Sequence, residues 1–273
     1  MSVQPIPDGL QTTPPASLAT DFMLLRGINK TFDTASGGHV HALQRIDLSI
    51  SAGQFASVIG ASGCGKTTLM RIVAGLELDY DGGVAIAGRV HSGPSRDIGI
   101  VFQDPNLLPW RTILNNVMLP AEVLKLDRSA ALERARWLIG LVGLAGFEDK
   151  YPSELSGGMR QRAAIARALV HDPSVLLMDE PFGALDALTR ETMNIELLKI
   201  WTAAKKTVFM ITHSISEAVF MSDRVIVMTP RPGRVVDDVL IDLPRPRTIE
   251  MMSETRFGEY TLKLRRRLND AQE

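Results

Sequence analysis

The sequence of 273 residues has little of several features that would narrow its class. Cys64 is its single cysteine, which excludes a disulfide framework and a cysteine-rich zinc site. No run of about 18 uninterrupted apolar residues occurs, so no membrane-spanning helix is expected. The start of the chain has no positively charged segment and no apolar segment of the signal-peptide type, so secretion is not expected. Positive charge is not in excess either, because 30 Lys and Arg face 31 Asp and Glu. This balance excludes a nucleic-acid binder that works through bulk charge.

The residues that are present have the composition of a globular α/β protein. Hydrophobic residues make up 45% of the chain and charged residues 22%, and a chain of this length can bury a full core. Residues 1–20 contain prolines, a single charged residue and no hydrophobic period, which predicts a poorly ordered leader.

Strand-like and helix-like patterns alternate along the rest of the chain. Strands are predicted at 42–50, 55–59, 83–87, 98–102, 175–178, 208–211 and 225–228. Helices are predicted at 66–74, within 113–150, from 157 to about 170, at 187–203 and shortly after 213. This order predicts a mostly parallel sheet with helices on both faces, interrupted by a helical block at 113–171.

A glycine-rich turn follows the predicted strand at 55–59 and precedes a predicted helix. It satisfies the phosphate-binding pattern G-x-x-x-x-G-K-[ST] at every fixed position, with the residues Gly60, Ala61, Ser62, Gly63, Cys64, Gly65, Lys66 and Thr67. Glycines allow backbone N–H groups to surround phosphate oxygens, and the helix N-terminus favours anions. Lys66 is expected to contact the β- and γ-phosphates, Thr67 to ligate Mg²⁺, and Thr68 to reach another phosphate. Cys64 is interpreted as a small filler of the loop.

Polar residues follow three of the predicted strands, at the sheet edge where open α/β folds bind ligands. Asp179 and Glu180 end the strand at 175–178; Asp179 is the candidate Mg²⁺ partner and Glu180 the group that polarises the attacking water. His213 is the candidate γ-phosphate sensor. Gln103 is expected to touch the metal ion or the water when the site closes.

A second anion site is predicted at the start of the helix that begins near residue 157. Ser156, Gly157 and Gly158 place a hydroxyl and bare N–H groups at a positive helix end. One chain with two half-sites for a phosphate suggests a head-to-tail dimer, in which each nucleotide lies between the loop of one copy and the Ser156 segment of the other.

Together these motifs resemble the ATP-binding subunit of an ABC transporter over about 24–247. The resemblance implies that Gly60–Thr68 is the Walker A loop, Gln103 the Q-loop glutamine, Leu155–Gln161 the signature motif and Val175–Glu180 the Walker B strand. It further implies that Ala184, Leu185 and Asp186 form the D-loop, that His213 is the switch histidine and that Phe32 stacks on adenine. Ser214 departs from the family, which usually has Asp there.

The resemblance also carries expectations about the fold, the domains and the partners. It implies an α/β P-loop fold of ABC type, with a mostly parallel sheet, an N-terminal antiparallel β part and a helical subdomain at about 104–171. The ATPase domain would cover 21–247 and a helical tail 248–273. The cofactors would be ATP and Mg²⁺, and the chain would form a homodimer on integral membrane permease subunits, at the cytoplasmic face of the inner membrane.

A finer resemblance is to the nitrate/sulfonate/taurine importer group. It is carried by four segments: Leu107–Thr112, Pro181–Asp186, Arg231–Arg234 and Leu243–Arg247. It implies a bacterial importer that acts with a periplasmic solute-binding protein. The Arg- and Pro-rich stretch from Arg231 to Arg247 is expected to be a solvated, extended cover, with a regulatory or lipid-facing role as the alternative. The apolar loop from Leu107 to Trp110 is expected to dock on a membrane partner, with simple packing as the alternative.

Two other functions share the phosphate-binding turn. A soluble ABC-type ATPase acting on nucleic acid or ribosomes would carry a coiled coil or a second cassette, and its partner would favour positive charge. A small-molecule kinase would have no use for the Ser156 segment or for Glu180. We therefore expect no nucleic-acid partner and favour an ATPase that powers transport.

Overall fold

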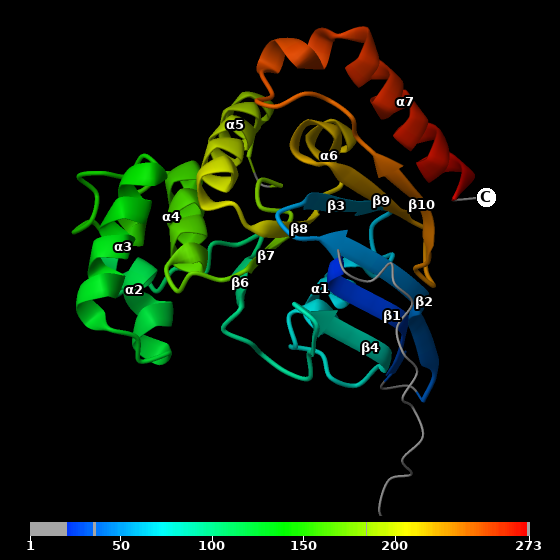
Figure 1. The fold of residues 1–273 in the computed structure, drawn as a ribbon, viewed down its shortest axis with the longest axis horizontal. Coiled ribbons are helices and arrows are strands. Elements are labelled where there is room, and N and C mark those ends of the chain that lie inside the picture. Colours follow the sequence, from blue (N-terminus) through cyan, green and yellow to red (C-terminus); the bar gives the residue numbers. More distant parts are fainter. Residues whose placement is uncertain (1–20, 35–36, 184, 272–273) are drawn as a thin grey trace, which may run out of the picture.

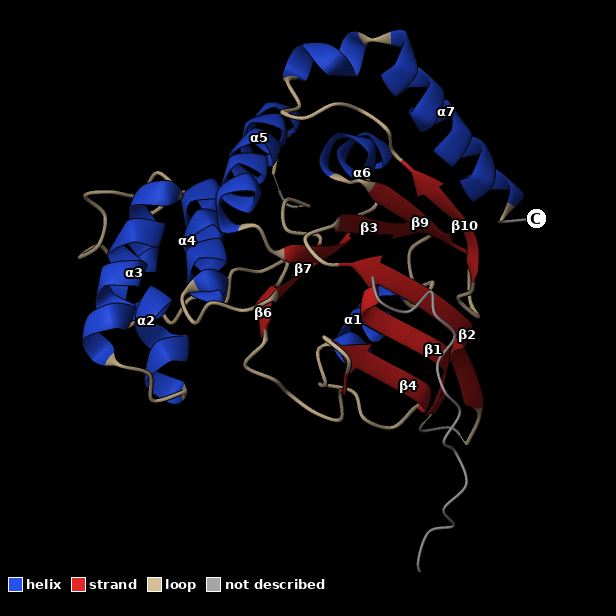
Figure 2. Cartoon of the chain, viewed as in Figure 1, coloured by secondary structure: helices blue, strands red, loops and turns tan. Residues whose placement is uncertain are grey.

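Two β-sheets and a set of surrounding helices make up the fold (Figures 1 and 2). The computed structural model describes residues 21–34, 37–183 and 185–271, so the predicted leader over 1–20 lies outside the described residues. The expected class is confirmed: a mostly parallel sheet carries an N-terminal antiparallel β part and a helical block.

The smaller sheet is antiparallel and has the strand order β2-β1-β4-β5. Its strands are β1 (Asp21–Asp33), β2 (His39–Ser51), β4 (Asp81–Ile86) and β5 (Arg89–Val90). In β2 the buried residues Ile46, Leu48 and Ile50 alternate with more exposed ones, which buries one face of the sheet and leaves the other to solvent.

The larger sheet has the strand order β10-β9-β3-β8-β7-β6, and all neighbouring strands except β10 and β9 run parallel. Its strands are β3 (Phe55–Gly60), β6 (Ile98–Val101), β7 (Val175–Asp179), β8 (Thr207–Ile211), β9 (Arg224–Met228) and β10 (Val235–Leu240). The central strands are buried on both faces, as their continuous apolar sequences predict. Their carboxyl ends share one edge, where the polar residues predicted for the site follow.

Helices cover both faces of the larger sheet. They are α1 (Lys66–Val73), α2 (Ile113–Val123), α3 (Arg128–Leu141), α4 (Gly157–Leu169), α5 (Ala187–Ala204), α6 (Ile215–Met221) and α7 (Thr255–Asp270), with 3₁₀ turns at Pro152–Glu154 and Ile249–Ser253. Helix α1 lies between the two sheets, α5 and α6 cover the opposite face, and α2 to α4 form a block at one side (Figure 1). Among the described helices, none combines the length and apolar composition needed to cross a membrane.

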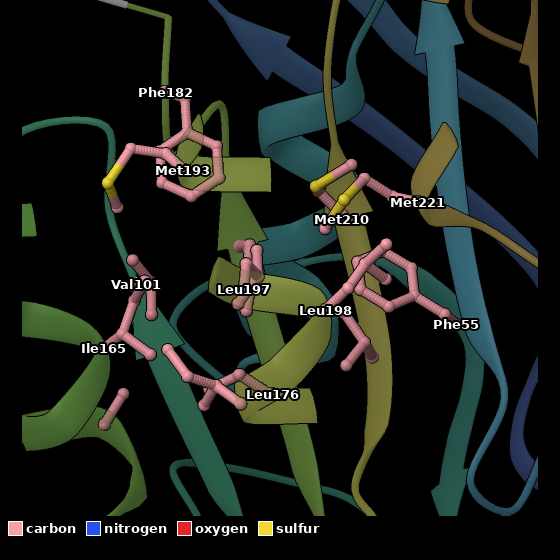
Figure 3. Close-up of a cluster of buried hydrophobic side chains, with 14 of the residues drawn as sticks. Phe55, Val101, Ile165, Leu176, Phe182, Met193, Leu197, Leu198, Met210 and Met221 are labelled. Atoms are coloured by element: carbon pink, nitrogen blue, oxygen red, sulfur yellow. The ribbon is translucent and has the colours of Figure 1, made fainter. Parts of the chain in front are cut away.

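The two faces of the larger sheet belong to different hydrophobic cores. Along β8, Val208 and Met210 pack into the core under α4 to α7, whereas Phe209 and Ile211 pack into the core shared with α1 and the smaller sheet. Figure 3 shows the first of these cores, where apolar side chains from the strands meet those of α4, α5 and α6. This alternation determines which face of the sheet packs against α1, and so determines the position of the turn that joins β3 to α1.

The expectation that the stretch from Arg231 to Arg247 is a solvated cover is wrong. Part of it forms β10. The Arg245 guanidinium stacks over Trp201 at 4.2 Å and bonds Asp223 at 2.7 Å. Arg247 is only 6% exposed, and its Nη1 donates to the carbonyls of Val219, Phe220 and Ser222. These carbonyls lie at the end of α6, where the helix leaves acceptors without partners of its own, and the buried guanidinium satisfies them.

Candidate functional site

The phosphate-binding turn lies between β3 and α1, at the carboxyl edge of the larger sheet. Gly63 and Gly65 have φ angles of +72° and +104°, which residues other than glycine rarely adopt. A Cβ on Gly65 would lie 2.7 Å from the Leu43 side chain and 2.8 Å from the Ala42 carbonyl oxygen. A Cβ on Gly60 would lie 2.8 Å from the sulfur of Cys64. These positions therefore require glycine because β2 and the loop itself fill the space.

The Lys66 side chain folds back onto the loop. It is 7% exposed, and its Nζ donates to the carbonyl oxygens of Gly60 at 2.9 Å and Ala61 at 3.0 Å. Cys64 is 1% exposed, and its sulfur lies 3.8 Å from Nζ. The cysteine fills the interior of the turn, and the ammonium group is held against two carbonyl oxygens of the loop.

Asp179, at the end of β7, faces the first turn of α1. The Thr67 hydroxyl donates to Asp179 Oδ1 at 3.4 Å. Burial raises the pKa of Asp179, and the charge of Glu180 adds to this, whereas the Thr67 hydrogen bond and the charge of Lys66 oppose it. The described residues contain no cluster of three or more His, Cys, Asp or Glu able to hold a metal ion. A pair of hard oxygen donors fits Mg²⁺, which binds few protein groups and completes its shell with water and substrate phosphates.

Glu180 is held in an unusual backbone conformation next to His213. Its φ angle is +44°, and its backbone N–H donates to the carbonyl of Ile211 at 2.9 Å. A residue other than glycine in this region costs about 1–3 kcal/mol, and such strain concentrates at functional sites. Oε2 of Glu180 lies 3.2 Å from Nδ1 of His213. The strained turn thus brings a carboxylate and an imidazole together at the sheet edge.

The turn that carries His213 is fixed by a buried carboxyl group. Thr212 donates its hydroxyl to Glu217 on α6 and accepts the backbone N–H of Ser214 at 3.0 Å. Burial raises the pKa of Glu217. Ser214 caps α6, because its hydroxyl accepts the N–H of Glu217 at 3.3 Å. The departure from the usual Asp therefore retains a helix-capping residue.

These elements enclose a pocket of about 500 Å³. Its lining includes the loop from Ser62 to Thr68 together with Phe32, Val40, Ala42, Glu180, His213 and Arg231. Phe32 is 38% exposed, and the buried Lys30 lies over its ring with Nζ 4.6 Å from the centroid. Lys30 is itself fixed by ion pairs of 3.0 Å to Glu77 and Asp79. An exposed aromatic face, a phosphate-type loop and a carboxylate line one cavity.

Other predicted site residues lie outside this pocket. Ser156 and Gly157 are exposed at the start of α4, with Gly158 half-buried beside them, and the Ser156 hydroxyl accepts the N–H of Met159 at 3.3 Å. Asp186 caps α5 by accepting the N–H of Thr189 at 3.0 Å, which holds its pKa below the usual range. Ala184 of the predicted D-loop lies outside the described residues.

Gln103 is related both to the pocket residues and to the residues near the start of α4. It lines a separate groove with Gly157 and Leu185. A Cβ on Gly183 would lie 3.3 Å from its amide nitrogen and 3.4 Å from Oε2 of Glu180. The amide and the carboxylate thus flank the same glycine.

Three lining residues were not predicted from the sequence. Val40 and Ala42 belong to β2, and Arg231 follows β9. Arg231 directs Nε and Nη2 to the carbonyl oxygen of Gly63 at 3.2 and 3.1 Å. The sequence did indicate that Arg231 follows a predicted strand at the same sheet edge. It did not indicate that this strand, β9, pairs with β3, because the two are far apart in the chain.

The fold and the pocket define a P-loop nucleotide-binding protein of the doubly covered α/β type. Residues 43–183 match the model of the ABC transporter family, and the chain belongs to this family. It is an ATP-binding protein and an ATPase.

Curated relatives extend over most of the chain. An uncharacterized ABC transporter ATP-binding protein of Methanocaldococcus jannaschii is 49% identical over 90% of this chain and 91% of its own. The taurine import ATP-binding protein TauB of Rhizobium johnstonii is 49% identical over 78% and 82%. The nitrate import ATP-binding protein NrtC of Synechococcus elongatus is 44% identical over 89% of this chain but 38% of its own length. The resemblance to the nitrate/sulfonate/taurine group is confirmed.

A solved structure has the same fold. It is a dimeric post-hydrolysis state of the ATP-binding cassette MJ0796 bound to ADP and Pi, 33% identical in sequence. The match has a TM-score of 0.70 and covers 81% of this chain and 100% of the cassette.

Proposed function

We propose that this chain is the ATP-hydrolysing subunit of a bacterial ABC importer. It would power uptake of a small solute of the nitrate, sulfonate or taurine type through a separate membrane permease, at the cytoplasmic face of the membrane. The names of the taurine and nitrate relatives support an import role. In this proposal residues 21–247 form the ATPase domain, with the helical subdomain at about 104–171, and 248–273 form a helical tail. A periplasmic solute-binding protein would deliver the solute.

The pocket residues divide the chemistry between them. Phe32 stacks on adenine, the N–H groups of Gly60–Thr68 surround the phosphates, and Lys66 neutralises phosphate charge. Thr67 and Asp179, with the Gln103 amide on closure, would hold Mg²⁺, which supplies charge neutralisation at the phosphates. Glu180 orients the attacking water as a base.

His213 is placed to sense the γ-phosphate beside Glu180. Its Nδ1 lies 3.2 Å from the carboxylate, so the two side chains hold one another at the position where the water and the terminal phosphate meet. A histidine that donates a hydrogen bond to the γ-phosphate stabilises charge that develops there during transfer.

The observation that carries the proposal is that the phosphate-type loop and the Ser156 helix start lie on one chain but do not share a pocket. The loop lines the nucleotide pocket, whereas Ser156 to Gly158 leave their helix end exposed outside it. A second copy, turned head to tail, would bring its Ser156 segment and Asp186 to this pocket and complete a nucleotide sandwich. The dimeric state of the related cassette supports this arrangement.

The segment after Gln103 presents an apolar surface to a permease. Asn116 is fully buried and holds the loop, because its amide accepts the N–H of Leu108 at 2.7 Å and donates to three carbonyls of the loop. Trp110, in this loop, is 72% exposed. Closure around the nucleotide would move Gln103 and this loop together and so pull on the permease. The near-neutral net charge does not favour the nucleic-acid alternative.

The variant Glu180→Gln tests the proposal. The amide keeps the size of the side chain but loses the negative charge that polarises water, so turnover should fall about 10²–10⁴-fold while ATP binding persists. Closed dimers should then accumulate, which gel filtration with ATP and Mg²⁺ measures against the nucleotide-free sample. Glu259→Gln, on the exposed side of α7, serves as the control and should behave as wild type.

Two results would contradict the proposal. Wild-type turnover by Glu180→Gln would remove the carboxylate from the chemistry. An inactive variant that binds ATP and stays monomeric would reject the shared site for the isolated subunit.

A further inference from the structure

The turn between β9 and β10 is built onto the phosphate-binding loop. Thr229 closes this turn, because its hydroxyl donates to the carbonyl of Pro232 and accepts the N–H of Arg234, both at 3.0 Å. Gly233 makes two backbone hydrogen bonds to β2: its N–H donates to the carbonyl of Ala42 at 3.0 Å, and its carbonyl accepts the N–H of Gln44 at 2.9 Å. A Cβ on Gly233 would lie 2.2 Å from the carbonyl oxygen of Cys64. Glycine is required there because the turn and the loop touch backbone to backbone.

Arg231 projects from this fixed turn to the rim of the nucleotide pocket. Its Nε and Nη2 converge on the carbonyl oxygen of Gly63, at 3.2 and 3.1 Å, and its side chain is part of the pocket lining. A guanidinium has five N–H donors, and the bonds to Gly63 use only two of them. Within the described part of the chain Nη1 has no hydrogen-bond partner. The Arg231 guanidinium is thus held in place by the neutral carbonyl of Gly63, and its remaining N–H groups are available to a ligand.

The other charges around the pocket favour an anion at this position. Lys66 and Arg231 are the Lys and Arg side chains in the lining, and Glu180 lies at the sheet edge with His213. Phe32 provides the apolar surface for the base. Arg231 instead contacts the loop whose N–H groups face phosphate, and a guanidinium matches phosphate oxygens in a two-pronged geometry that an ammonium cannot form.

We propose that Arg231 is a phosphate-binding residue of the nucleotide site. Held at the rim by Gly63, its guanidinium contacts the phosphate chain of the bound nucleotide as a second cation beside Lys66. This inference rests on the nucleotide site proposed above. It assigns a ligand contact to the Arg-Pro-Gly-Arg turn, which lies outside the Walker A loop and the other motifs of the site.

The test is nucleotide affinity of the purified chain with Arg231→Gln, Arg231→Lys and the matched control Arg234→Gln. Arg234 lies in the same turn, but its guanidinium bonds the Gln44 side chain at 2.9 Å, away from the pocket. Arg231→Gln should raise the Kd for ATP about five-fold, because a charged contact is replaced by a neutral one. The loss should shrink as salt is added, since screening weakens the charged contact in the wild type.

Further measurements separate a phosphate contact from support of the loop. Inorganic tripolyphosphate, tested by competition with ATP, should lose affinity for Arg231→Gln by the same factor, because the contact does not involve the base. Arg231→Lys should recover part of the affinity, since it keeps the charge but loses the fork. Arg234→Gln should match the wild type in every assay, and thermal melting should be unchanged for Arg231→Gln at its exposed position.

Wild-type affinity and salt dependence in Arg231→Gln would overturn the inference. So would a loss for ATP without a loss for tripolyphosphate, or a loss that Arg231→Lys does not reduce. Lys66→Ala, measured in parallel, separates this failure from that of the proposed function. If Lys66→Ala loses binding and Arg231→Gln does not, only the role of Arg231 is wrong. If neither variant loses binding, the nucleotide site itself is misplaced.

Discussion

The loop half of the site and the Ser156 half differ in how much of their structure one chain completes. In the loop half, Lys66 is buried, Glu180 is held in a strained turn, and side chains from both sheets close the pocket. In the other half, the exposed Gly157 begins α4, and the Ser156 hydroxyl makes an ordinary helix cap. In the proposed function, this difference means that a single chain can hold a nucleotide, whereas the Ser156 half acts only when a second copy brings a pocket to it.

The largest effect on nucleotide binding is expected from Lys66→Ala, in the loop half. Removal of the ammonium takes away the buried counter-charge of the phosphates in both the bound state and the transition state. We expect kcat/KM for ATP to fall about 1,000-fold, with loss of tight equilibrium binding. Nucleotide titration and phosphate release measure the two effects. Unchanged affinity would show that the loop half does not hold the nucleotide.

A smaller and different effect is expected from Gly157→Asp, in the Ser156 half. A Cβ there has no neighbour closer than 3.9 Å, and a carboxylate in the first turn of a helix is favourable for the fold. The same charge would repel a phosphate. We expect thermal stability to be kept, ATP binding by the monomer to change less than about two-fold, and hydrolysis to fall about 100-fold. Equal losses of binding and turnover would remove the distinction between the halves.

Mixing the two variants sharpens this comparison further. In a mixed dimer, one site combines the intact loop of Gly157→Asp with the intact Ser156 segment of Lys66→Ala. Hydrolysis should therefore recover when two inactive proteins are combined, to less than half of the wild-type rate because only one site in a mixed dimer is intact. Absence of recovery, with both variants folded, would mean that the two halves act within one chain.

The smallest effect is expected from Phe32→Ala. The ring offers one face to adenine while Lys30 lies over it at 4.6 Å. Loss of stacking should weaken ATP binding by about 1 kcal/mol, and binding of a base-less triphosphate should not change. Tyr151→Ala is the control, because this ring is 45% exposed and does not line the nucleotide pocket. If wild type binds ATP and the base-less triphosphate equally well, Phe32 does not stack on adenine.

The parts of the fold that local sequence determines were predicted well. The turn from Gly60 to Thr67 and the acids at the end of β7 lie where the pattern placed them, because each motif follows its strand directly in the chain. Strand β10 was missed, since Val235 and Val236 precede two adjacent aspartates and break the alternation that marks a strand. It forms at the edge of the sheet by pairing with β9, where a strict alternation of apolar and polar residues is not required.

The parts that depend on distant partners were not predictable. From the sequence alone, Arg247 is predicted to be a solvent-exposed charge. No residue near it in the chain indicates that its acceptors are three carbonyls at the end of α6. Arg231 reads as a turn residue, and its contact with Gly63 arises only because β9 lies beside β3. The motifs identify the groups for nucleotide chemistry, whereas the residues that support them are assigned by the strand order.

The hydrogen bonds of Lys66 to Gly60 and Ala61 give the loop an internal competitor for its own lysine. A ligand must draw the ammonium away from two carbonyls, so its gain is the difference between new and old contacts rather than their full value. A ligand that offers a single weak acceptor gains almost nothing from this exchange, whereas a chain of phosphates gains much more. If the loop binds phosphate as proposed, we expect this internal competition to favour polyphosphates over small anions.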